Sequence, residues 1–153
     1  MKRLIISSLA LLFLTLAQFC AHANLGENLS QIEQRYGLPV GEAGNPARFI
    51  LEFSFHGYRV LVTFSAADIS VIEGFSKQNG QQLSDPEIGA ILSENSLNSR
   101  WVPLSNYQFK AWRLASNAAQ AAYLRGKLTL GTEFNIDGYL NYLKATNLNH
   151  NTF

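Results

Sequence analysis

The clearest pattern in the sequence is an alternation over positions 49–64, in which apolar residues recur at every second position and most of the residues between them are polar. Apolar side chains occupy every second position on both sides of a central His56-Gly57 pair. A two-residue turn at this pair would put the apolar side chains of both strands on one face, as a half-buried hairpin requires. The pattern therefore predicts an antiparallel hairpin, with a third strand over 69–75.

Two segments carry helix signals instead of alternation. Asn28 and Gln31 form the pattern of a capping box ahead of an apolar stripe that runs to Tyr36. Ser84 and Glu87 form a second capping box ahead of another apolar stripe. We therefore expect one short helix before the three strands and another after them.

The last third of the chain is less regular. The remaining expected elements are a loop over 40–48, strands over 101–102, 109–114, 119–124 and 127–130, a helix over 138–144 and a flexible tail over 147–153. The resulting order, α-βββ-α-ββββ-α, is typical of the α+β class. It predicts an antiparallel sheet of meanders with short helices packed on one face, in two layers.

The N-terminal segment predicts a secretory signal peptide over 1–23. Basic residues come first, an apolar run covers 4–19, and Ala21-His22-Ala23 offers small residues for cleavage. The apolar run is shorter than the roughly 20 residues that a membrane-spanning helix needs. We therefore expect a periplasmic or secreted protein without a stable membrane anchor, whose single domain covers 24–146.

Cleavage would change the chemistry of the chain. It would remove Cys20, the only cysteine, so the mature domain would have neither disulfides nor a thiolate nucleophile. It would also remove Lys2 and Arg3, which leaves ten basic residues (12 − 2) against eleven acidic ones. A chain without a basic excess is not expected to bind nucleic acid.

Few residues suit catalysis. The mature chain has two histidines, His56 and His150, and no Gly-x-Ser-x-Gly motif. We therefore expect no catalytic residues, no cofactor and no metal site. One alternative stays open, because Glu52, Asp68 and Glu73 lie on or near the predicted sheet. Two facing carboxylates in a deep pocket would suit a small hydrolase.

Aromatic residues are frequent, at 12% of the chain. Four of them lie close together in the sequence, namely Trp101, Tyr107, Phe109 and Trp112. Such residues often anchor protein interfaces, and they also fill cores that lack disulfides. They are the candidate interface residues of this chain.

Several motifs resemble those of small secreted bacterial proteins with a Leu-Gly…Tyr-Gly-x-Pro start. The matching segments are Leu25-Gly26, Tyr36-Gly37-Leu38-Pro39, Leu83-Ser84, Glu87-Ile88, Trp112-Arg113 and Leu128-Thr129-Leu130. This resemblance implies a bacterial exported domain and no particular activity. The opening helix ended by Gly-x-Pro is also similar to the β-lactamase-inhibitor-protein-like fold, which small outer-membrane assembly lipoproteins share. This chain lacks the disulfide pairs of the inhibitors and the lipidation cysteine of the lipoproteins.

The sequence thus favours a non-enzymatic exported module that binds an envelope or secreted protein or another envelope component. A small carboxylate-dependent hydrolase and a secreted protein inhibitor are the alternatives. The second alternative rests only on the remote fold resemblance.

Overall fold

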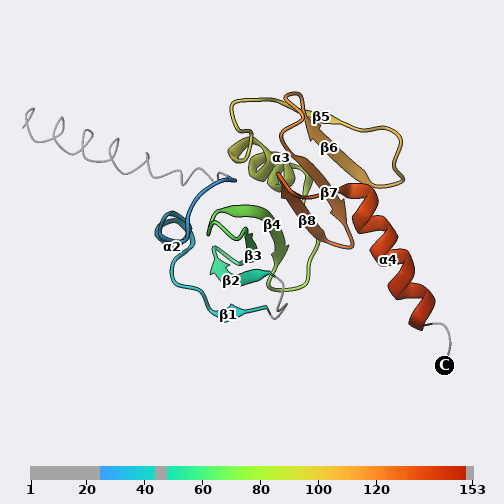
Figure 1. The fold of residues 1–153 in the computed structure, drawn as a ribbon. Helices are drawn as coiled ribbons and strands as arrows, with labels where there is room; N and C mark the ends of the chain where they lie inside the picture. The colour runs from blue at the N-terminus through green and yellow to red at the C-terminus, as the bar shows by residue number, and fades with distance from the viewer. Residues whose placement is uncertain (1–24, 44–47, 151–153) are drawn as a thin grey trace, which may run out of the picture.

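The computed structural model describes residues 25–43 and 48–150, and it confirms the α+β class (Figure 1). Within these residues one antiparallel sheet has eight strands in the order β1-β2-β3-β4-β8-β7-β6-β5. The elements are α2 (Leu29–Tyr36), β1 (Gly41–Glu42), β2 (Phe49–Phe55), β3 (Tyr58–Phe64), β4 (Ser70–Lys77), α3 (Asp85–Glu94), β5 (Trp101–Pro103), β6 (Lys110–Leu114), β7 (Gln120–Leu124), β8 (Lys127–Gly131) and α4 (Ile136–His150). The predicted signal peptide lies outside the described residues.

The sheet consists of two halves of similar plan. In each half a helix precedes four strands, α2 with β1 to β4 and α3 with β5 to β8. The last strands of the halves, β4 and β8, pair antiparallel and join them into one sheet. In Figure 1 the first half curls around an axis seen end-on, whereas the second half is seen from the side. The short strands β1 and β5 form the two edges of the sheet as described.

One face of the sheet packs against α2 and α3. The predicted hairpin register is confirmed, since Phe53 pairs with Val60 and Leu51 with Val62. All four side chains are buried in one core together with Ile32 of α2. Alternation along the strands and helical spacing along α2 therefore bring the apolar side chains of both elements to the same layer.

The opposite face carries the beginning of α4. Ile136 and Phe134 pack there on Ala111 and Ala122. Ala122 follows Ala121, which faces the main core, so this second cluster lies on the other side of the sheet. Two helices thus cover one face, as predicted, whereas the third, which the prediction places on the same face, covers part of the other.

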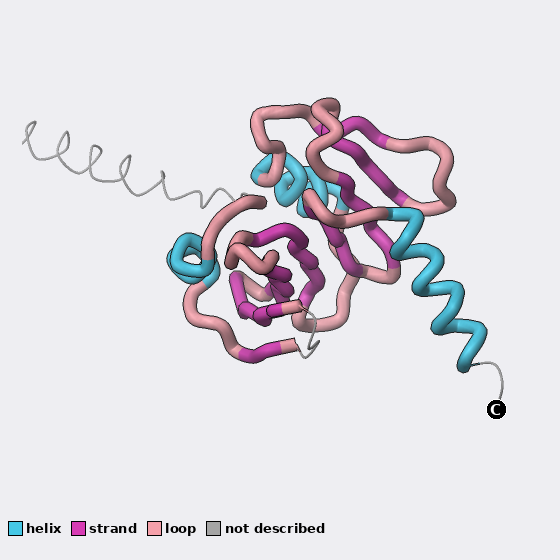
Figure 2. The backbone as a smooth tube through the Cα atoms, viewed as in Figure 1, coloured by secondary structure: helices cyan, strands magenta, loops and turns pink. Residues whose placement is uncertain are grey.

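Two elements differ from the sequence prediction (Figure 2). Strand β1 lies within 40–48, where a loop was expected; it pairs Gly41 with Glu52 through the backbone. Helix α4 is longer than 138–144 and includes 147–150 of the expected tail. Strand β1, with two residues, is too short to show the alternation from which a strand is predicted.

The predicted two-residue turn at His56-Gly57 is confirmed, and a second turn of the same kind joins β7 to β8. His56 and Gly57 have φ of 48° and 84°, and Arg125 and Gly126 have φ of 52° and 80°. Two successive positive φ values define the type I′ turn, whose twist matches that of the strands it joins.

The junction of the two halves requires a glycine. A Cβ atom on Gly131 would lie 2.3 Å from the backbone oxygen of Val71. The end of β8 therefore approaches β4 at a distance that no larger residue permits.

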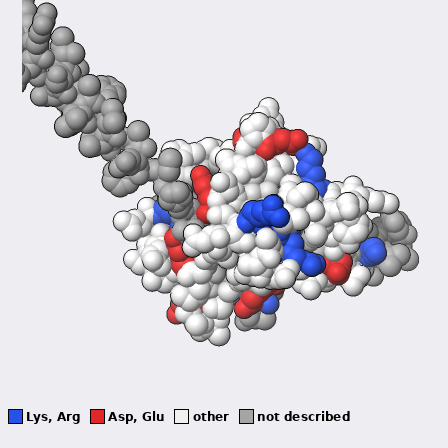
Figure 3. All heavy atoms as spheres, turned by 90° about the horizontal axis from the view of Figure 1, so that it is seen from above, with Lys and Arg blue, Asp and Glu red and all other residues white. Residues whose placement is uncertain are grey.

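Charged side chains are spread over the surface. On the face in Figure 3, a short band of Lys and Arg lies near the middle, with Asp and Glu close by and uncharged atoms around it. Arg59 and Glu52, for example, form a two-point ion pair across β2 and β3. In the described part of the chain, no helix has the length and apolar character needed to cross a membrane.

Candidate functional site

A cleft of about 370 Å³ lies between α2, α3 and the turn that joins β2 to β3. We call it the aromatic cleft, because aromatic rings make up much of its wall. Its lining residues are Tyr36, Phe55, His56, Tyr58, Phe75, Pro86, Glu87, Ala90, Ile91 and Glu94. A mostly apolar cleft of this size with a few polar groups is typical of small-molecule sites.

Strand register places three of the rings. Phe55 pairs directly with Tyr58 across the hairpin, and Phe75 lies on the same face of the neighbouring strand β4. Tyr36 approaches from the last turn of α2, and its ring centroid lies 5.3 Å from that of Phe55 and 6.4 Å from that of Phe75. Strands β2, β3 and β4 and the last turn of α2 thus supply the four rings of the wall.

The α3 side of the cleft is polar and carries Glu87. The Tyr58 hydroxyl donates a hydrogen bond of 2.8 Å to Glu87 Oε1, and the Lys77 ammonium lies 2.9 Å from the same oxygen. The Ser84 hydroxyl and backbone N–H donate to Glu87 Oε2, each at 2.7 Å. These donors, those of Ser84 first, lower the pKa of Glu87 to about 2.

The environment of Tyr58 shows the sign of the local field. Its pKa is raised to about 12, first by burial and then by Glu87 and Glu94. Glu94 is the last residue of α3, whose final turn contains no basic residue. The C-terminal end of a helix carries partial negative charge and the N-terminal end partial positive charge. Glu94 therefore adds to the negative C-terminal end of α3, whereas Glu87, in the first turn, offsets the positive N-terminal end.

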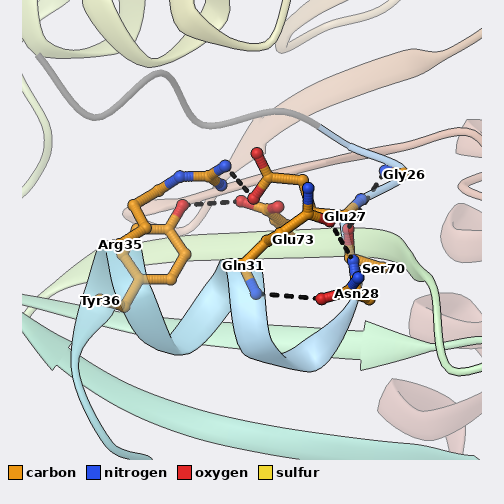
Figure 4. A network of polar contacts seen from close by, with 8 residues as sticks. All are labelled: Gly26, Glu27, Asn28, Gln31, Arg35, Tyr36, Ser70 and Glu73. Atoms are coloured by element: carbon orange, nitrogen blue, oxygen red, sulfur yellow. Dashed lines mark hydrogen bonds and ion pairs between the residues drawn. The ribbon is translucent and has the colours of Figure 1, made fainter.

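Behind Tyr36 lies a buried polar network that joins α2 to β4 (Figure 4). The Tyr36 hydroxyl donates a hydrogen bond of 2.9 Å to Glu73 Oε2. Glu73 is fully buried, and burial raises its pKa to about 7 against the opposing effects of Tyr36 and Arg35. Arg35 forms an ion pair with Glu27, and its guanidinium carbon lies 5.4 Å from the Tyr36 ring centroid.

Ser70 anchors the segment that precedes α2. Its hydroxyl oxygen accepts hydrogen bonds of 3.1 Å from the backbone N–H groups of Gly26 and Glu27. Asn28 and Gln31 then form the capping box that the sequence predicts. The helix start is therefore fixed on β4, and this fixes the position from which Tyr36 enters the cleft wall.

The three carboxylates considered for hydrolysis lie apart. Glu52 binds Arg59 on the outer face of the sheet, whereas Glu73 is buried under α2. Asp68 is exposed in the turn between β3 and β4, with φ of 55°. The structure therefore gives these residues no shared pocket.

The four candidate interface aromatics are all half-buried and divide into two groups. Trp101 and Trp112 pack against the main core, and the Trp101 indole N–H donates a hydrogen bond of 2.6 Å to the Leu92 carbonyl of α3. Tyr107 and Phe109 pack against the second cluster, with ring centroids 5.2 Å apart. The Tyr107 hydroxyl donates to Asp137 of α4.

These aromatics border shallower hollows. Trp112 lines one hollow with Phe109 and Pro103, and two more beside α3, where Gly89 contributes no side chain. Their role as an interface stays a prediction. The aromatic cleft contains none of the four.

The sequence pattern does not mark the cleft residues as a site. Tyr36 and Phe55 were assigned to the apolar stripes of their elements, and Glu87 to a helix cap; each assignment is correct. One signal was present: Glu73 interrupts an inward-facing apolar row of β4, which marks a buried polar contact. Within the described residues no group of three His, Cys, Asp or Glu side chains could hold a metal ion.

Searches of the chain against protein-family models, curated proteins and solved structures found no match. The resemblances noted from the sequence motifs therefore stay predictions.

Proposed function

We propose that the protein is an exported, non-enzymatic binding module and that the aromatic cleft is its ligand site. The observation that carries the proposal is the cleft itself, a cavity of about 370 Å³ whose wall is formed by four aromatic rings. Binding is favourable when an apolar group displaces water from such rings, because apolar surface is then removed from water. A ligand buried there contacts residues of both helices and of the hairpin turn.

The polar groups at the cleft favour binding over catalysis. Glu87, with a pKa of about 2, is a poor proton acceptor at neutral pH, because general bases work best near the operating pH. Glu73, with a pKa of about 7, suits acid-base chemistry, but it is fully buried behind Tyr36 and is not part of the cleft wall. Glu87 and Glu94 lie seven residues apart on one helix, about 10 Å along its axis, so they do not face each other.

A neutral fluorescent probe of apolar sites, N-phenyl-1-naphthylamine, tests the cleft. We expect saturable fluorescence enhancement at one site per chain. Ala90 is exposed on α3 and lines the cleft, so Ala90→Trp should fill the cleft and weaken the binding of the probe about tenfold or more. Ser93 is exposed on the same helix but does not line the cleft, so Ser93→Trp is the matched control. Absence of saturable binding, or equal binding by both variants, would overturn the proposal.

Export is tested separately. Expression of the full chain should yield a periplasmic or secreted product whose N-terminal residue is Asn24. Recovery of the intact chain from the cytoplasm would exclude export and leave the cleft proposal to its own test.

A further inference from the structure

The chemistry of the cleft wall also specifies the charge of its ligand. Four rings line the cleft, and the two phenol hydroxyls among them donate to carboxylates, Tyr36 to Glu73 and Tyr58 to Glu87. A phenol that donates to a carboxylate is polarised toward phenolate, and this increases the negative charge on its ring face. Negative ring faces attract cations.

The charges around the cleft point the same way. Glu87 and Glu94 lie on the α3 side, and Lys77 is the cation paired with Glu87. The C-terminal end of α3 adds partial negative charge beside Glu94, since its last turn has no basic residue. The residues that line the cleft thus include two carboxylates and neither Lys nor Arg.

The groups behind the wall do not reverse this balance. Arg35 is neutralised by its ion pair with Glu27, and Glu73 adds either no charge or a further negative one. The Arg35 guanidinium lies 5.4 Å from the Tyr36 ring centroid, so this ring already has a cation partner, and a bound cation would contact chiefly the other rings. His56 stands at the opposite rim, with its ring 4.2 Å from that of Phe55.

We propose that the aromatic cleft binds a small organic cation, an alkylated or quaternary ammonium whose charge lies on the α3 side near Glu87 and Glu94 and whose apolar part lies against Phe55 and Phe75. This inference rests on the proposed function, because it needs the cleft to be a ligand site. A quaternary ammonium suits the site because it keeps its charge at every pH and loses little hydration on entering an aromatic cavity.

Three probes with the same alkyl chain test the charge preference by displacement of N-phenyl-1-naphthylamine. We expect hexyltrimethylammonium to displace the dye at the lowest concentration, 1-hexanol to follow and hexanesulfonate to be weakest. Added NaCl should weaken the binding of the cation and leave the binding of hexanol unchanged, since salt screens charges near the surface.

Glu94→Gln keeps the shape of the side chain and removes its charge. It should weaken the binding of hexyltrimethylammonium about two- to fivefold, as for a partly exposed cation site, and leave the binding of hexanol unchanged. Glu42→Gln, at an exposed position on β1, is the control and should change neither ligand. Because Glu87 caps α3, it is left intact.

The outcomes separate the two proposals. If hexanol or hexanesulfonate displaces the dye as well as the cation does, or if Glu94→Gln leaves the cation unaffected, the cation preference is wrong and the cleft remains an apolar site. If the dye itself does not bind, the cleft is not a ligand site, and both proposals fall.

Discussion

The two halves of the sheet share one plan but bury different chemistry. Under α2, the inward side of β4 carries Glu73 beside Phe75, and the hydroxyl of Tyr36 in the helix donates a hydrogen bond to the Glu73 carboxylate. Under α3, the inward positions of β8 are Leu128 and Leu130, and the helix contributes only apolar side chains to the core. The first half thus has a buried carboxylate as its polar anchor, whereas among the described residues the second half buries no charged side chain, and its polar contacts with α3 include hydrogen bonds to backbone carbonyls such as that of Leu92.

This contrast explains where the cleft forms. Apolar side chains can shift until they fill a gap, but a hydrogen bond holds its partners at a fixed distance and angle. Tyr36 is held by Glu73, and its ring therefore stays in the cleft wall. The half with the buried polar anchor is accordingly the half that contributes most of the aromatic wall.

The largest expected effect tests whether the halves unfold together. Phe53 is fully buried in the first half, so Phe53→Ala should lower the free energy of unfolding by about 3–5 kcal/mol. Both tryptophans of the chain lie in the second half, at Trp101 and Trp112. Since β4 and β8 join the halves, the tryptophan fluorescence transition in urea should shift as far as the circular dichroism transition.

A tryptophan transition that stays in place while the circular dichroism changes would show that the halves unfold separately. Leu128→Ala, which removes a fully buried side chain from the second half, provides the reciprocal control.

The next effect concerns the polar anchor and pH. The pKa of Glu73 is about 7 in the folded chain against an ordinary 4.5, so between these values the folded state holds a proton that the unfolded state has lost. The contribution of Glu73 to the free energy of unfolding should therefore be fully present below pH 4.5 and fall by about 3 kcal/mol as the pH rises through 7. Glu73→Gln should remove this fall, and the difference between the two proteins isolates it from other titrating groups.

Urea unfolding of both proteins at pH 5 and pH 8 measures the effect. If the free energy of unfolding changed equally between the two pH values in Glu73→Gln and in the unaltered chain, the pKa of Glu73 would be close to its ordinary value. The buried carboxyl would then not distinguish the two halves in their response to pH.

The smallest effects compare two glycines. Gly131→Ala would place a Cβ against the Val71 carbonyl at the junction of the halves, and we expect a loss of about 1–3 kcal/mol. Gly89→Ala has open space on α3, and it should add about 0.5–1 kcal/mol because alanine favours the helix. Thermal unfolding of both variants provides the measurement, and equal shifts would show that the junction is not tightly packed.

Most of the fold could be predicted because its signals are local. The hairpin follows from alternation around His56-Gly57, and the starts of α2 and α3 follow from their capping boxes. Strand β1 was missed because Gly41 and Glu42 pair through backbone groups, which leave no trace in the side-chain pattern.

The candidate site could not be predicted in the same way. Tyr36, Phe55 and Phe75 have the spacing of ordinary core residues, and they do contact the core. Whether a gap remains between them depends on how α2 and α3 pack on the sheet, and on the small side chain of Ala90, which lines that gap. Such packing involves residues far apart in the sequence, so no local pattern specifies it.

The edges of the sheet bear on aggregation. In the described part of the chain both edge strands are its shortest, β1 with two residues and β5 with three. Pro103 at the end of β5 also lacks an N–H that another strand could use. Partly folded β-rich chains can pair through exposed strand edges, and short edges offer neighbouring chains little backbone to pair with.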